Sequence, residues 1–205
     1  CIAITSVVLF HVGLHGFSGG FVGVDVFFVI SGYLIGGLIY RDVAVGTFSI
    51  LNFYQRRAKR ILPAFFAVML ASYALGFLLL SPEELKSFCK QALAALTSTS
   101  NIYYWWANDY FAADADLNAL LMTWSLAVEE QFYVFFPLLM LILYRRSSRH
   151  LMASILMLSI ASFAASWILI QQYPTAVFYL LPTRAWELGI GAMLAIREMS
   201  SSSSN

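Results

Sequence analysis

Long apolar stretches separated by short polar segments dominate the pattern of this 205-residue chain. A transmembrane helix needs about 20 mostly apolar residues to cross the hydrocarbon core of a bilayer. Six stretches predict membrane helices, the first of them short: residues 2–14, 21–40, 61–80, 120–144, 151–170 and 176–196. A further helix is expected around residues 91–107. The pattern therefore predicts an all-α, polytopic membrane bundle of six or seven segments.

The two ends of the chain carry their own signals. The first apolar stretch lacks the basic residues that open a signal peptide, and few residues precede His11. We therefore expect the chain to begin inside a membrane helix. Residues 1–199 are expected to form part of one membrane domain, truncated at both ends. The Ser-rich residues 200–205 are expected to be a polar tail or a cut edge.

Composition agrees with a membrane protein. Apolar residues make up 60% of the chain and charged residues only 11%, against about 45–50% and 25% in soluble domains. So little charge cannot cover a soluble particle of this size. The net charge of +1 argues against nucleic-acid binding. Cys1 and Cys89 show no metal-ligand spacing, so no metal site is expected.

Basic residues predict the orientation, because Lys and Arg concentrate in cytoplasmic loops. Three segments are expected to be cytoplasmic on this ground: Arg41 with Arg56, Arg57, Lys59 and Arg60; Arg145, Arg146 and Arg149; and Arg197. The acidic segment 81–119 is expected to face outward. These assignments agree only if residues 91–107 do not cross completely, so we expect a re-entrant or interfacial helix there.

Ionisable side chains inside apolar helices are expensive and mark functional sites. His11 and Asp25 lie near the outward ends of adjacent antiparallel segments, where they could pair. A lone histidine in such a helix can equally be a packed, hydrogen-bonded residue. Glu129 and Glu130 are adjacent and point about 100° apart, so one helix face cannot serve both. A desolvated carboxylate of this kind suits proton transfer.

Other charged and small residues admit two interpretations. Arg57 and Arg60 lie three residues apart and could grip a phosphate, although juxtamembrane arginines often serve only as topology determinants. Arg184 and Glu187 are also three apart, and mutual neutralisation explains them. The small residues around Gly32 and Gly36 favour close helix packing. On these residues alone, a proton-coupled transporter fits as well as an enzyme.

Four longer segments narrow the choice. They are FVGVDVFFVISGYLI at residues 21–35, FYQRRAKRILP at 53–63, TWSLAVEEQFY at 123–133 and LPTRAWEL at 181–188. In this order they resemble the membrane acyltransferase-3 family, in particular the branch that modifies bacterial surface polysaccharides. The resemblance implies a domain of about ten helices in the bacterial inner membrane, of which this chain would hold a part.

The resemblance also implies a reaction. The family moves an acyl group, commonly acetyl, from cytoplasmic acyl-CoA to a hydroxyl of an extracytoplasmic glycan such as lipopolysaccharide or peptidoglycan. Membrane lipids and, in the full-length chain, an SGNH-type domain are further expected partners. A proton-coupled transporter or an inactive fragment is the alternative.

Individual residues match the family motifs. His11 matches the family's histidine, whose arginine partner would fall one place before Cys1. This histidine would act as general base or acyl carrier. Asp25 or a glutamate would orient it, Glu129 and Glu130 match the buried carboxylates, and Arg57 with Arg60 would hold the phosphates of CoA.

Overall fold

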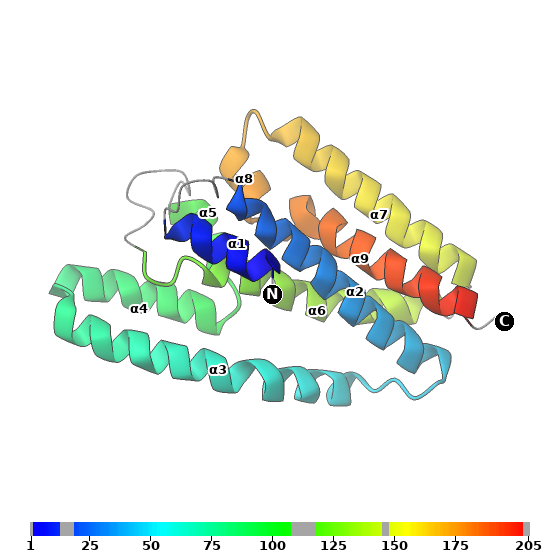
Figure 1. Cartoon of the computed structure of the whole chain (residues 1–205), viewed down its shortest axis with the longest axis horizontal. Coiled ribbons are helices and arrows are strands. Elements are labelled where there is room, and N and C mark those ends of the chain that lie inside the picture. The colour runs from blue at the N-terminus through cyan, green and yellow to red at the C-terminus, as the bar shows by residue number, and fades with distance from the viewer. Residues whose placement is uncertain (1, 13–18, 108–117, 145–147, 203–205) are drawn as a thin grey trace. The chain divides into compact units, whose positions relative to one another are not determined.

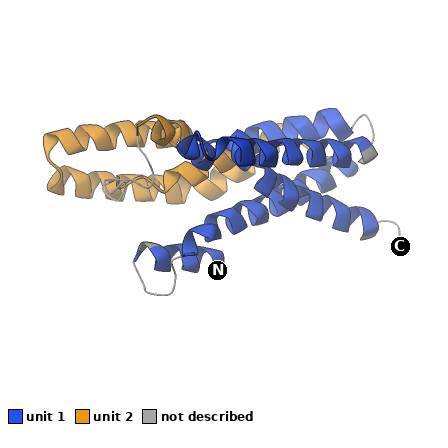
Figure 2. Ribbon diagram, turned by 90° about the horizontal axis from the view of Figure 1, so that it is seen from above, with its two compact units in different colours: residues 1–46, 132–205 blue, residues 47–131 orange. Residues whose placement is uncertain are grey.

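The computed structural model of the chain describes residues 2–12, 19–107, 118–144 and 148–202. These residues form α-helices and one short 3-10 helix, and no strand occurs among them (Figure 1). The chain divides into two compact units, coloured in Figure 2. Unit 1 comprises residues 1–46 and 132–205, and unit 2 comprises residues 47–131. The all-helical class predicted from the sequence is confirmed.

Unit 1 is built around its last helix. Its elements are α1 (Ile2–His11), η1 (Gly20–Val22), α2 (Gly23–Ala44), the second part of α6 (Thr123–Tyr144), α7 (Ser148–Leu169), α8 (Pro174–Tyr179) and α9 (Leu181–Ser202). Helix α9 packs against both α2 and α7 (Figure 1). Its buried residues, including Leu188 and Ala192, therefore form the centre of this unit.

Glycines bring the backbones of α2 and α9 into direct contact. A Cβ placed on Gly32 would lie 2.0 Å from the carbonyl oxygen of Leu188, and one on Gly36 would lie 2.6 Å from Cα of Ala192. Because both residue numbers rise together along the contact, the two helices run in the same direction. The predicted packing role of these glycines is thus confirmed.

Parallel packing gathers the basic helix ends. The C-terminal ends of α2 and α9 lie at the same end of unit 1, and α6 ends there too, because the Tyr40 and Tyr144 ring centroids are 5.9 Å apart. Arg41 and Arg197 belong to this end, as the predicted cytoplasmic side requires. Asp25, in the first turn of α2, lies at the opposite end. Another predicted cytoplasmic segment has side chains outside the described residues: Arg145, Arg146 and Arg149.

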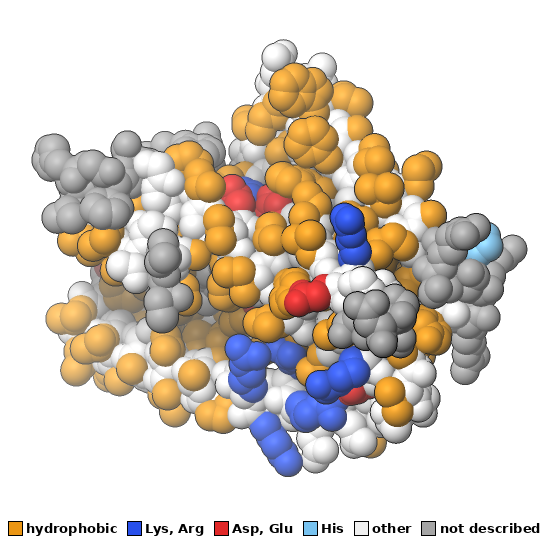
Figure 3. Space-filling view, turned by 45° about the vertical axis from the view of Figure 1, so that its right-hand side comes forward, with side chains coloured by type: hydrophobic (Ala, Val, Ile, Leu, Met, Phe, Trp, Pro, Cys, Tyr) orange, Lys and Arg blue, Asp and Glu red, His pale blue; other side chains and the backbone are white. Residues whose placement is uncertain are grey.

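Unit 2 contains α3 (Ile50–Leu79), α4 (Pro82–Leu96), α5 (Ser100–Ala107) and the first part of α6. Helix α3 is 30 residues long and begins after its N-cap residue Ser49. Its early turns include the basic residues Arg56, Arg57, Lys59 and Arg60. Many large side chains of α3 are exposed, among them Leu70 and Leu78. Figure 3 shows hydrophobic side chains over much of the face that it presents, as expected for helices that meet lipid.

The region predicted as a single helix over residues 91–107 is two helices. Helix α4 begins earlier, because Ser81 and Glu84 form a capping box ahead of Pro82. The hydrogen bonds from Ser81 also lower the pKa of the Glu84 carboxyl. The chain then turns at Ser98, whose φ is 54°. With 15 and 8 residues, neither α4 nor α5 can cross a bilayer alone, which supports the expected incomplete crossing.

The number of candidate spans is smaller than the six or seven expected. Among the described residues, four segments are long and apolar enough to cross a membrane: Gly20–Ala44, Ile50–Leu79, Thr123–Tyr144 and His150–Leu169. Helix α1 has only 10 residues. The predicted span 176–196 is interrupted at Leu180, which has an extended conformation, and the 22-residue α9 carries charged residues in its first and later turns.

The contact between α2 and α9 predicts that a glycine-to-alanine substitution destabilises the protein inside the contact and has little effect outside it. Gly32→Ala should lower the free energy of unfolding by about 1–3 kcal/mol, because the new Cβ overlaps the Leu188 carbonyl. Gly19→Ala is the matched control, since no atom lies within 4 Å of the added Cβ. Thermal unfolding in detergent measures both variants. An unchanged Tm for Gly32→Ala would contradict the close packing.

Candidate active site

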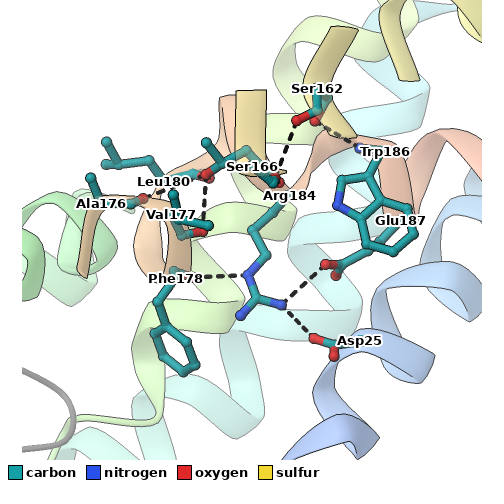
Figure 4. A network of polar contacts seen from close by, with 11 residues as sticks. Asp25, Ser162, Ser166, Ala176, Val177, Phe178, Leu180, Arg184, Trp186 and Glu187 are labelled. Atoms are coloured by element: carbon teal, nitrogen blue, oxygen red, sulfur yellow. Dashed lines mark hydrogen bonds and ion pairs between the residues drawn. The ribbon is translucent and has the colours of Figure 1, made fainter. Parts of the chain in front are cut away.

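A proline creates the centre of the site. Helix α8 ends at Tyr179 and α9 begins at Leu181, with Pro182 in its first turn. Proline has no N–H, so it cannot make the helical hydrogen bond to the carbonyl of Phe178, four residues earlier. Arg184 fills that role, because its Nε donates to the Phe178 carbonyl oxygen at 2.9 Å (Figure 4). Its guanidinium carbon also lies 4.9 Å from the centroid of the Phe178 ring.

Hydroxyl groups satisfy the remaining backbone groups at this break. Thr183 Oγ1 lies 2.8 Å from the carbonyl oxygen of Leu180 and 3.0 Å from that of Val177. From α7, Ser162 Oγ accepts a hydrogen bond of 3.1 Å from the Trp186 N–H, and Ser166 donates to the Thr183 carbonyl (Figure 4). The start of α9, and with it Arg184, is therefore fixed from two sides.

Arg184 joins two carboxylates from different helices. Its Nη1 donates to Glu187 Oε1 at 3.1 Å and also to Asp25 Oδ1 of α2 (Figure 4). The side chains of Arg184 and Glu187 are only 12% and 3% exposed, whereas that of Asp25 is 35% exposed. The contact between Arg184 and Glu187 that their spacing predicts is confirmed. Asp25 is the third member that the pattern did not predict.

This cluster can exchange a proton or hold a polar group at its open side. One cation faces two carboxylates, so the cluster carries excess negative charge when both are ionised. The second carboxylate oxygen of Glu187, Oε2, is buried, and no described residue donates a hydrogen bond to it. Buried charge of this kind is tolerated only with close partners. The half-exposed Asp25 is the member that an outside molecule can reach.

His11 is the last residue of α1, and its side chain lies outside the described residues. Helix α1 packs on the start of α2, where a Cβ on Gly23 would lie 2.4 Å from the Ala3 carbonyl oxygen. The expected pair of His11 with Asp25 stays a prediction, and the described partner of Asp25 is Arg184.

In unit 2, Glu129 and Glu130 have different surroundings, as their 100° separation predicts. The Glu129 side chain is buried, with 4% of its surface exposed. Glu130 is half-buried and accepts a hydrogen bond from Ser98 Oγ in the turn between α4 and α5. The next residue, Gln131, donates to the Ser98 carbonyl at 3.0 Å. Glu130 therefore has a structural contact that holds this turn.

The two arginines proposed for phosphate binding lie on α3. Arg57 is half-buried, with its guanidinium carbon 5.8 Å from the Phe53 ring centroid, and Arg60 is exposed one turn later. Residues three apart lie on neighbouring positions of one helix face. Both arginines belong to unit 2, whereas Asp25 belongs to unit 1. The contacts that the structure describes thus form two separate clusters, one in each unit.

The sequence contains one indication of the ion pair between Asp25 and Arg184. Asp25 and Arg184 each stand near the start of an apolar helix, and lone charges at such places need partners. Apolar patterning does not show which helices are neighbours, so the pair could not be assigned. Within the described residues, no group of three or more His, Cys, Asp or Glu side chains could hold a metal ion.

Comparison with known proteins identifies the family. The model of an acyltransferase domain, Acyl_transf_3, matches residues 1–205. The chain belongs to the acyltransferase 3 family. The resemblance seen in the four sequence segments is confirmed, and the Asp25–Arg184 pair joins two of those segments. No solved structure matches the chain.

Curated relatives of this family are similar at about the same level. O-acetyltransferase OatA of Staphylococcus aureus is 36% identical over 202 residues, which cover 94% of this chain and 32% of OatA. The putative peptidoglycan O-acetyltransferase YrhL of Bacillus subtilis is 34% identical, covering 95% and 31%. An uncharacterized Haemophilus influenzae protein is 35% identical, covering 84% and 73%. The chain thus spans about a third of the length of OatA and YrhL.

The contacts of Asp25, Arg184 and Glu187 predict that substitutions at these three residues destabilise the protein to different extents. Arg184→Gln should destabilise the protein by about 3–5 kcal/mol, because the buried Glu187 carboxylate loses its cation. Replacing both residues by methionine should recover most of that loss, since no charge is then buried between them. Asp25→Asn should cost less, because Asp25 is more exposed. Denaturant unfolding in detergent, followed by tryptophan fluorescence, measures all three. Equal losses in the single Arg184 variant and the double variant would contradict this account.

Proposed function

We propose that the full-length protein is an integral membrane O-acetyltransferase that moves an acetyl group from acyl-CoA to a glycan hydroxyl. Membership of the acyltransferase 3 family over residues 1–205 carries this proposal. Peptidoglycan is the favoured acceptor, ahead of lipopolysaccharide, because YrhL is named for it. The greater length of OatA and YrhL leaves room for more helices and an SGNH-type domain beside the membrane domain at residues 1–199.

The proposed reaction replaces the thioester of acetyl-CoA by an ester on the glycan. The acceptor hydroxyl oxygen bonds to the acetyl carbonyl carbon, the C–S bond of the thioester breaks, and CoA leaves as a thiol. The proton of the hydroxyl must be removed and one delivered to the sulfur. His11 is the proposed group, either as general base or as a carrier that holds the acetyl group between two transfers. Asp25, held by Arg184, would orient the imidazole and stabilise its cation.

The charge distribution supports a direction for the transfer. In unit 1, Arg41 and Arg197 lie at one end and Asp25 with Arg184 at the other. If the basic end is cytoplasmic, the Asp25 end faces the glycan on the outside of the inner membrane. Arg57 and Arg60 would bind the phosphates of acyl-CoA. The buried Glu129 is proposed to take part in proton transfer, as is Glu130 in addition to its contact with Ser98.

Loss of the histidine tests the proposed chemistry. Membranes that contain the full-length protein should transfer labelled acetyl from acetyl-CoA to peptidoglycan, and His11→Ala should reduce the rate at least about 100-fold, the usual contribution of a general base. His150→Ala, at an exposed position in α7, is the control. The measurement is ester-linked acetate released from the glycan by mild base.

The same preparation separates the proposal from its rival. A proton-coupled transporter would produce proton flux in proteoliposomes in the absence of acyl-CoA, and no glycan would become acetylated. Wild-type activity in His11→Ala would remove this histidine from catalysis while leaving the transferase proposal in place.

Donor binding is tested by a second pair of variants. Arg57→Ala should raise the KM for acetyl-CoA about tenfold or more with little change in kcat, because a charge-assisted bond to phosphate is lost. Lys59→Ala, an exposed residue about 160° from Arg57 around α3, is the control. Acetyl-pantetheine, which has no phosphates, should show the same KM with wild type and Arg57→Ala. An unchanged KM for acetyl-CoA in Arg57→Ala would contradict the phosphate role.

A further inference from the structure

A polar hollow lies between α4 and α5 in unit 2, and none of its lining residues belongs to the candidate active site. Its volume is about 470 Å³. The residues that line this α4–α5 hollow are Pro82, Glu83, Lys86, Ser87, Lys90 and Tyr103. On α4 they stand at positions i, i+3, i+4 and i+7 from Glu83, which is the spacing of one helix face. The hollow therefore presents a row of charged groups opposite an aromatic ring.

The aromatic side of the hollow is held in place by buried polar contacts. Tyr104 is fully buried, and its hydroxyl donates to Gln91 Oε1 of α4 at 3.1 Å. Gln91 in turn donates to Asn118 Oδ1 at 2.7 Å. The ring of Tyr103 meets that of Tyr104 edge to face, with the centroids 5.3 Å apart. These contacts fix α5 against α4, so the Tyr103 ring has a defined place beside the lysines.

The charges of the hollow favour an anion. Within the described residues, neither Lys86 nor Lys90 has an ion-pair partner, and both side chains are exposed. Glu83 is the acidic residue in the lining, whereas Glu84 accepts hydrogen bonds from Ser81 at 2.7 and 2.8 Å. Two ammonium groups therefore face one carboxylate. A ligand with a negative group and an apolar ring face would match the lysines and Tyr103 together.

We propose that the α4–α5 hollow is a subsite for a carboxylate-bearing sugar of the acceptor glycan. The carboxylate binds between Lys86 and Lys90, and the sugar ring lies on the Tyr103 ring. This rests on the proposed glycan acetyltransferase function, because the acidic segment 81–119 is expected on the outer side, where the acceptor is found. The subsite would select and hold the acceptor and would take no part in the chemical step.

The test uses the full-length protein in membranes and two soluble peptidoglycan fragments that differ only at the sugar carboxylate, which is free in one fragment and amidated in the other. Lys86→Ala with Lys90→Ala should raise the KM for the free-carboxylate fragment about fivefold, as expected for two exposed charge contacts. The KM for the amidated fragment, the KM for acetyl-CoA and kcat should stay unchanged. Arginine at both positions should preserve the wild-type KM, and Glu83→Gln should lower it.

Two results would overturn the subsite. A similar rise in KM for both fragments would show that the carboxylate is not recognised. A rise in KM for acetyl-CoA alone would assign the lysines to the phosphates of the donor. Tyr103→Ala should weaken binding of both fragments while Tyr103→Phe should not, and equal binding by both Tyr103 variants would remove the ring from the site.

Direct binding separates this proposal from the proposed function. Saturation-transfer NMR with the purified protein detects fragment binding even if no acetyl group is transferred. Carboxylate-dependent binding that requires Lys86 and Lys90, in a protein without transferase activity, would overturn the function and keep the subsite. Acetyl transfer to both fragments with equal KM in wild type would keep the function and overturn the subsite.

Discussion

Direct backbone contact between α2 and α9 is the constraint on which the rest of unit 1 depends. Lipid is as apolar as a leucine side chain, so helices in a membrane associate mainly through close packing and polar contacts. Gly32 meets the Leu188 carbonyl, and Gly191 meets that of Val29, so each helix contributes glycine to the same contact. Because these helices are parallel and in this register, their first turns come together, and Asp25 reaches Arg184. Side chains larger than hydrogen at these glycines would separate that pair.

Burying the charges of Asp25, Arg184 and Glu187 costs free energy, and neighbouring residues lower that cost. Pro182 has no N–H to donate to the Phe178 carbonyl at the break between α8 and α9, and Arg184 donates to that carbonyl while pairing with two carboxylates. The Arg184 side chain thus provides a hydrogen bond to a backbone carbonyl and an ion-pair partner for the buried Glu187 carboxylate. Apolar residues of similar volume would often pack at least as stably as a buried ion pair. Stability alone therefore does not account for the cluster, and this favours a functional role for the exposed member, Asp25.

Much of the fold can be predicted from the sequence, because a long apolar segment forms few structures other than a membrane helix. The limits of α2, α6 and α7 lie within four residues of the predicted stretches, whereas α3 begins 11 residues before its predicted stretch, because the helix continues through the basic segment. Glycine spacing correctly indicates close packing. The prediction lacks the breaks at Ser98 and Leu180. The apolar stretch 176–181 runs across Leu180, although Pro182 indicates a break there, and the polar run 97–101 is the signal for the turn at Ser98. The Asp25–Arg184 pair joins residues 159 apart in the chain. It depends on which helices are neighbours, and a single sequence does not encode that choice in any local pattern.

The separation of charge along α2 bears on how acetyl transfer could work. Asp25 and Arg41 are 16 positions apart on one helix, which at 1.5 Å per residue is about 24 Å. The hydrocarbon core is about 30 Å thick, so these residues mark nearly opposite sides of it. If, as proposed, the donor is held by its phosphates on the basic side and the glycan lies on the other, the two cannot meet by diffusion through lipid. The thioester must reach inward between helices, or a protein side chain must carry the acetyl group over the last part of the path. The proposed histidine, His11, has a short side chain, so in either of its proposed roles the thioester must pass between the helices until it lies within reach of the imidazole.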